Sequence, residues 1–156
     1  MIQIMDKSYL YNLASQSLNR ARDLQSQISQ IDLDIRFQQL SNKSSFAGMT
    51  DSLHLIHLQR QRLNLIPQRD SHISESISYA IEILLDDIKR GESGYLSVGA
   101  MLVNNIHSFM SIYDVNAHIS VVTRYKLAEL SYKLALPGFS YMDVATKVEN
   151  LKSRLY

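Results

Sequence analysis

Hydrophobic and small residues recur at alternating steps of four and three along the first forty positions of the chain. This spacing is the a/d repeat of a helix that packs along a narrow seam against a neighbouring helix. Neither glycine nor proline interrupts the segment between residues 6 and 40. The pattern predicts one long helix over these residues, with a seam formed by Leu10, Ala14, Ser17, Ala21, Leu24, Ile28, Ile31 and Ile35.

The two halves of this predicted helix differ in the width of their hydrophobic face. Tyr9, Leu13 and Leu18 widen the face of the first half, which is typical of a helix packed in a globular core. The second half keeps only the seam, flanked by Gln, Ser and Asp. About 35 residues span roughly 50 Å as a helix, whereas a compact chain of 156 residues is about 40 Å across. We therefore expect the second half to extend beyond the body and to be covered by another helix.

The rest of the chain also shows helical periodicity, broken by turn-forming residues. A polar loop over 41–50 precedes a predicted helix over 52–66, which Pro67 should end. Further helices are expected from Asp70 to Gly91, over 96–113, from Asn116 to about residue 136, and over 140–155. The helix over 96–113 is the most apolar and should be central. Its Asn104, Asn105 and His107 either line a polar pocket or mark the one exposed edge of the helix, and the exposed edge is favoured.

These elements predict an all-α fold of about six helices in a single domain, residues 1–156. The first two helices should form an antiparallel hairpin, an arm over residues 1–66, packed on a helical bundle over residues 70–156. Only 5 Gly and 2 Pro among 156 residues argue against a sandwich or barrel of many short strands. The hydrophobic share of 46% also excludes a disordered chain.

The amino-acid composition excludes several kinds of functional site. The chain has no cysteine, so disulfide scaffolds, cysteine nucleophiles and thiolate metal sites are excluded. No secretory signal pattern opens the sequence, and no apolar run approaches the roughly 20 residues that span a bilayer. The expectation is a cytoplasmic protein without a membrane partner, with export lacking a cleavable signal as the alternative.

The net charge of +1 conceals a basic segment followed by an acidic one. Residues 36–69 carry five basic groups and one acidic group, whereas residues 70–92 carry six acidic and two basic groups. Arg60, Arg62 and Arg69 are therefore candidate phosphate ligands in a nucleic-acid-binding segment over 54–69. The favoured alternative is internal pairing, because an antiparallel hairpin brings Arg60 and Arg62 level with Asp32 and Asp34.

No motif predicts catalysis, a cofactor or a metal centre. His54 and His57 have the spacing of two metal ligands on a helix, but no third ligand stands at a helical offset from them. Phosphate loops, nucleophile elbows and dinucleotide glycine patterns are all missing from the sequence. His72, His107 and His118 are scattered, and the sequence alone cannot place an acid and a nucleophile beside any of them. An enzyme with a site around Asn104 and His107 is the least favoured hypothesis.

The sequence thus favours a non-catalytic protein–protein interaction or assembly module, such as an adaptor, a chaperone-like protein or a structural subunit. Its expected partner is a helix of another protein or a second copy, giving a homo-oligomer. The predicted contact residues are those of the narrow seam and the helix after it: Leu24, Ile28, Ile31, Ile35, Ile56 and Leu63. A nucleic-acid-binding accessory protein that uses the basic segment 54–69 is the alternative.

Overall fold

The computed structural model describes residues 7–42, 49–90, 98–113, 115, 121–135 and 141–155. Across this described part every regular element is an α-helix, which confirms the predicted fold class. The helices are α1 (Lys7–Asn42), α2 (Met49–Lys89), α3 (Val98–Tyr113), α4 (Val121–Ala135) and α5 (Tyr141–Leu155). Most of the predicted loop over 41–50, the predicted stop at Gly91 and the predicted start at Asn116 lie outside the described residues.

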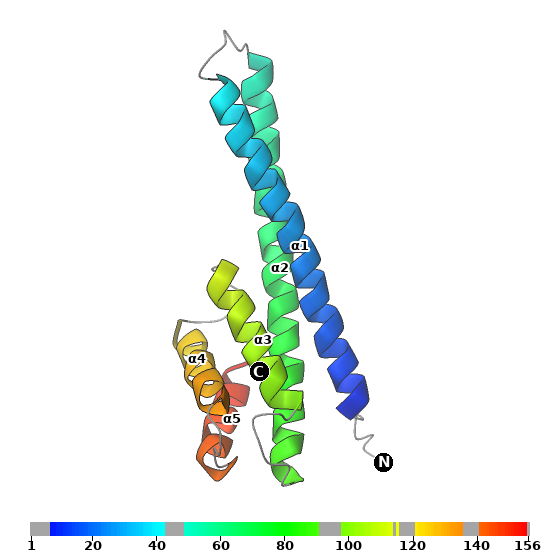
Figure 1. The fold of residues 1–156 in the computed structure, drawn as a ribbon, viewed down its shortest axis with the longest axis vertical. Coiled ribbons are helices and arrows are strands. Elements are labelled where there is room, and N and C mark those ends of the chain that lie inside the picture. Colours follow the sequence, from blue (N-terminus) through cyan, green and yellow to red (C-terminus); the bar gives the residue numbers. More distant parts are fainter. Residues whose placement is uncertain are drawn as a thin grey trace.

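Helices α1 and α2 form a long antiparallel hairpin, as predicted (Figure 1). With 36 and 41 residues, they extend over about 54 Å and 61 Å. Helices α3 and α5 pack against the lower half of α2, and α4 lies on α3 and α5, so the upper half of the hairpin projects from the body (Figure 1). We call the projecting part, residues 28–42 of α1 and 49–66 of α2, the arm.

Pro67 does not end a helix, and this prediction was wrong. Helix α2 continues through Pro67, so the predicted helices over 52–66 and from Asp70 onward are one element, and the described part contains five helices instead of about six. Proline in a helix interior removes one backbone hydrogen bond and costs about 3 kcal/mol. Helix α1 runs unbroken beside both halves of α2, and packing against it outweighs this cost. Asp70, expected to cap a new helix, is buried instead.

The hydrophobic core lies at the base of the hairpin. Residues of α1 face α2 there, with alanines at several positions that let the two helices approach closely. The contributing side chains of these two helices are Leu10, Ala14, Leu18, Ala21, Ile73, Ile77, Ala80, Ile81 and Leu84. Buried residues of α3, α4 and α5 complete the same cluster. The first half of α1 therefore belongs to the body, and the projecting arm is shorter than the predicted arm over residues 1–66.

Polar pairs align α1 with α2 from the base of the hairpin to the lower part of the arm. Lys7 pairs with Asp87 at the base, Gln25 accepts a hydrogen bond from Arg69 at 2.6 Å, and Asp32 accepts one from Arg62 at 2.6 Å. The residue numbers in each pair (7 and 87, 25 and 69, 32 and 62) add to 94, as expected for two antiparallel helices in constant register. The Asp32–Arg62 contact confirms the alignment predicted for the hairpin.

A buried carboxylate joins three helices at the base. Asp87 is fully buried, and its Oδ2 accepts a hydrogen bond from the backbone N–H of Gly99 at 3.2 Å. Because Gly99 is the second residue of α3, the carboxylate lies at the positive end of that helix. The same carboxylate pairs with Lys7 of α1. Gly99 permits this crossing, because a Cβ there would lie 2.9 Å from Cα of Leu84.

We expect Gly99→Ala to lower the free energy of unfolding by about 1–3 kcal/mol, because the added methyl group forces α3 away from α2 and from Asp87. Urea denaturation followed by circular dichroism measures this change. Ser108→Ala, at an exposed position of the same helix, is the matched control and should stay within about 0.5 kcal/mol. Equal stability of the two variants would contradict the close crossing.

Candidate interaction surface on the helical arm

The predicted contact residues fall into two groups in the structure. On α1, Ile28 is almost fully buried, and Leu24, Ile31 and Ile35 are half-buried on the side toward α2. The predicted seam of α1 is thus occupied by the chain's own second helix. On α2, the predicted contact residues Ile56 and Leu63 are exposed and face away from α1. The side of α2 that meets α1 is formed by Leu55, Leu58 and Leu65.

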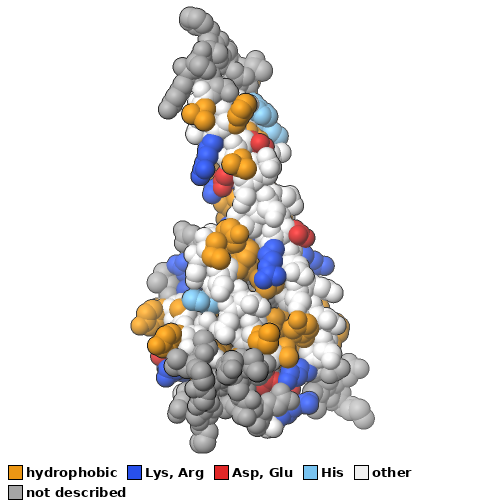
Figure 2. All heavy atoms as spheres, viewed as in Figure 1, with side chains coloured by type: hydrophobic (Ala, Val, Ile, Leu, Met, Phe, Trp, Pro, Cys, Tyr) orange, Lys and Arg blue, Asp and Glu red, His pale blue; other side chains and the backbone are white. Residues whose placement is uncertain are grey.

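The arm carries exposed hydrophobic side chains on both of its outer sides. Leu33, Phe37 and Leu40 of α1 form one set, which we call the α1 outer stripe; Leu53, Ile56 and Leu63 of α2 form the α2 outer stripe. All six side chains are between 44% and 70% exposed. Figure 2 shows hydrophobic side chains on the arm well above the body. Such a concentration on a thin projection is typical of a surface that contacts a partner.

The α1 outer stripe was missed in the sequence, although its signal is present there. Leu33, Phe37 and Leu40 repeat the steps of four and three that define the inner seam, displaced by two residues. Two residues correspond to about 200° around a helix, so this second seam lies on the far side of α1 from α2. A helix with two such seams packs between two neighbours. Only one of those neighbours, α2, belongs to this chain's arm.

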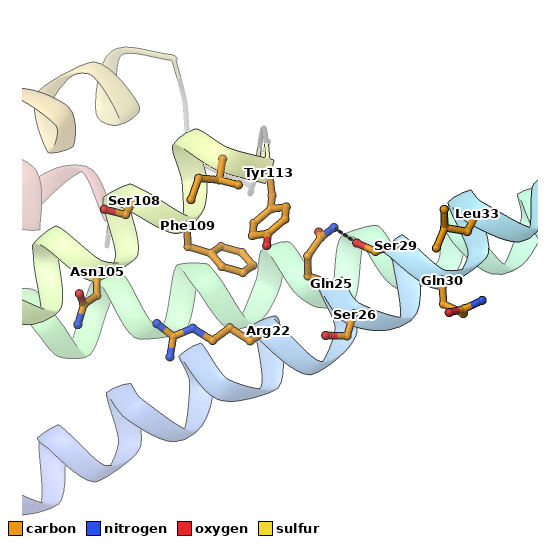
Figure 3. A pocket seen from close by; sticks show the side chains of 11 residues that line it. Arg22, Gln25, Ser26, Ser29, Gln30, Leu33, Asn105, Ser108, Phe109 and Tyr113 are labelled. Atoms are coloured by element: carbon orange, nitrogen blue, oxygen red, sulfur yellow. Dashed lines mark hydrogen bonds between the residues drawn. The ribbon is translucent and has the colours of Figure 1, made fainter. Parts of the chain in front are cut away.

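An open groove lies where the arm joins the body, between α1 and the C-terminal turns of α3. It has a volume of about 620 Å³, and its walls combine amide and hydroxyl groups with apolar side chains. In Figure 3, Phe109 and Tyr113 of α3 lie across from Gln25 of α1, which donates a hydrogen bond to Ser29 at 3.1 Å. Leu33 lines the groove and also begins the α1 outer stripe, so the two surfaces are continuous.

A buried polar layer crosses the hairpin at the level where the arm begins. The guanidinium of Arg69 donates to Asp70 Oδ1 at 3.0 Å and to Gln25 Oε1 at 2.6 Å. All three residues are less than one-tenth exposed. Buried charges of this kind are tolerated only when each has a partner. The layer lies between the hydrophobic core and the arm, and within it the charges of Arg69 and Asp70 neutralise each other.

The three predicted phosphate ligands do not form one surface. Arg69 is buried in the polar layer, Arg62 contacts Asp32, and Arg60 is exposed on the outer side of α2. Two of the three guanidinium groups are therefore held by acidic or amide groups of the hairpin itself. The basic segment contributes to the alignment of α1 and α2.

Serine and histidine side chains lie close together at two places in the structure. Ser17 donates a hydrogen bond to Glu75 at 3.1 Å, and His72 Nδ1 lies 3.5 Å from the same carboxylate. Ser17 is almost fully buried, and its hydroxyl meets the carboxylate and not the imidazole, so it is not an activated nucleophile. On α3, the hydroxyl of Ser111 donates to the backbone oxygen of His107 at 2.9 Å, which directs its proton away from the ring.

The remaining polar candidates have structural surroundings. Asn104 accepts a hydrogen bond from Ser131 of α4 at 2.7 Å, whereas Asn105 is exposed and lines the groove. His54 and His57 are both exposed on the arm, and the described residues include no cluster of three or more potential metal ligands among His, Asp and Glu. Within the same residues, none of the helices has the length and apolar character needed to span a membrane.

Helices α4 and α5 are joined by a surface contact outside the candidate surface. Lys147 donates a hydrogen bond to Glu129, and this bond together with the positive charge lowers the pKa of the Glu129 carboxyl. Lys152 of α5 pairs with Glu82 of α2 at 3.2 Å. These two pairs link α5 to α4 and to α2 at the surface of the body.

Comparison of the chain with models of protein families, with curated proteins and with solved structures finds no match.

The polar layer and the exposed pair on the arm should differ sharply in their effect on stability. Arg69→Leu leaves the carboxylate of Asp70 buried without its partner, so we expect a loss of about 3–5 kcal/mol in the free energy of unfolding. Arg62→Leu, the same change two turns away in the same helix, breaks a pair whose side chains are both 40% exposed and should cost about 0–1 kcal/mol. Chemical denaturation of both variants tests the contrast, and similar losses would refute it.

Proposed function

We propose that this protein is a non-catalytic interaction or assembly module that contacts its partner through the arm. The observation that carries this proposal is the exposure of six large hydrophobic side chains along one short projection: Leu33, Phe37, Leu40, Leu53, Ile56 and Leu63. The partner surface is helical, because the spacing of Leu33, Phe37 and Leu40 is that of a coiled-coil seam.

The magnitude of burial indicates how the contact is made. A large aliphatic side chain taken fully out of water contributes about 1.5–3 kcal/mol, so three on one stripe contribute at most about 4–9 kcal/mol. Association costs an estimated 4–15 kcal/mol before any contact is gained. One stripe alone therefore supports only weak binding. A stable contact requires both stripes, or one stripe together with apolar residues of the groove such as Phe109, Ile112 and Tyr113.

The internal packing of the arm supports the same proposal. Among the arm side chains that the structure describes, only Ile28 and Leu58 are buried. An isolated pair of helices with so little buried surface is marginally stable, because helices in water depend on packing of an apolar face. Covering the outer stripes would stabilise the arm at the same time as it joins the partner.

A photo-crosslinking amino acid at Phe37, introduced in the source cells, tests the proposal. We expect a crosslinked product of defined mass, because Phe37 should lie against the partner. The same amino acid at Tyr125, an equally exposed aromatic position on α4, is the matched control and should give far less product. Mass spectrometry then identifies the second component as another copy of the chain or as a different protein.

The proposal fails if the arm gives no more product than α4. Crosslinkers at Leu40 and Leu63 serve as further positions, so a poorly reactive geometry at Phe37 does not decide the result. Circular dichroism of each purified variant confirms that the helices are intact.

A further inference from the structure

We infer that the partner on the arm is a second copy of this chain, with the α1 outer stripe of one arm packed along the α2 outer stripe of the next. The two arms lie side by side and point the same way. This inference rests on the proposed function, since it names the occupant of the same surface.

The two stripes match in height. In the hairpin, residue numbers of α1 and α2 at one level add to about 94, which places Leu40 level with Leu53 and Phe37 level with Ile56. If a second arm stands beside the first at the same height, its α2 runs antiparallel to the first α1. Leu40 then meets Leu53 of the second copy, and Phe37 meets Ile56 of the second copy. In each of these two layers, a residue at heptad position a of one helix faces a residue at position d of the other, as in antiparallel coiled coils.

Charges on the arm are complementary in this arrangement. The next layer pairs Leu33 with Arg60 of the second copy, whose aliphatic stem covers Leu33 while its guanidinium reaches Asp34. Asp34 and Arg60 are both exposed, and Asp34 accepts a hydrogen bond from Gln30 at 3.1 Å, which leaves further acceptor capacity on the carboxylate. On the other flank, Arg36 faces the neutral Gln59 of the second copy. In these layers, no like charges face each other among the residues that the structure describes.

The alternative pairing of two copies through α1 alone is disfavoured by the same charges. A two-fold axis that sets Leu33 opposite Phe37 brings the Asp34 flank of one helix against the Asp34 flank of the other. It also brings Arg36 against Arg36. Like charges that face each other in this way oppose association.

The resulting contact is head-to-tail, because the two stripes on one chain are different surfaces. Each added copy offers another free stripe, so association continues until a ring closes or a row of arms forms. Because one stripe pair is small, self-association should depend strongly on protein concentration. The groove beside Leu33 stays open on the side of α3.

Sedimentation of the full chain over a range of concentrations, combined with charge exchange, tests the inference. The wild-type chain should form oligomers whose mass rises with concentration. Asp34→Arg and Arg60→Asp should each weaken association by about tenfold, because each places like charges in contact. The double variant D34R/R60D should restore the association constant to within about threefold of the wild type. Arg36→Glu is the matched control and should change it little.

A second measurement does not depend on charge. Because the chain has no cysteine, Leu40→Cys and Leu53→Cys can be mixed as two single-cysteine proteins and oxidised. A head-to-tail contact predicts disulfides mainly between the two variants, since their Cα atoms approach closely only across the proposed interface. Products linking Leu40→Cys to itself in equal or greater yield would refute the arrangement.

The inference is overturned if the chain stays monomeric at every concentration. It is also overturned if the double variant associates no more tightly than the two single variants. Neither result removes the proposed function, because crosslinking from Phe37 to a different protein would still support an interaction arm. The two failures are therefore distinguishable.

Discussion

The register of the α1–α2 hairpin is the constraint on which the rest of the structure depends. It is set by the buried guanidinium of Arg69, which is held by Asp70 on its own helix and by Gln25 on the other. A slip of α1 along α2 would keep the Arg69–Asp70 pair but would separate Arg69 from Gln25, leaving a buried hydrogen bond unmade at a cost of about 1–3 kcal/mol. Aliphatic layers alone specify register weakly. With this layer fixed, Lys7 meets Asp87, and Asp87 in turn holds the first turn of α3.

The hairpin divides into a stable lower half and a weakly packed upper half. Below the polar layer, α1 and α2 bury large aliphatic residues, and α3 and α5 pack against α2. Above it, the arm has only a thin internal contact, with a proline in α2 at the junction. Local unfolding is easiest where few apolar contacts and exposed hydrogen bonds coincide. The same division leaves the arm free to contact a partner without disturbing the core.

Much of the fold can be predicted from the spacing of hydrophobic residues, because α1 and α2 pack along seams whose residues recur at alternating steps of three and four in the sequence. The unbroken repeat before residue 40 indicates the long helix and its overhang, and the charges of Asp32 and Arg62 indicate the alignment of the hairpin. The continuity of α2 through Pro67 was not predictable in the same way, since it depends on tertiary packing against α1. The Asp87–Gly99 contact joins helices whose crossing no local pattern encodes. The α1 outer stripe is also visible in the sequence, but it runs through the same stretch of α1 as the stronger inner seam, displaced from it by two residues.

Two outer stripes on opposite sides of the arm carry a stronger implication than either one alone. An arm that presented a single apolar side could be satisfied by one helix laid against it, after which its other side would be polar. Here both α1 and α2 are apolar on the side away from each other, so each helix is built to lie between two neighbours. A lone partner helix would leave one of these sides in water, whereas repetition of the arm itself covers both with surfaces that the chain already contains. The proposed lateral packing of identical arms is thus the simplest arrangement that covers both stripes at once.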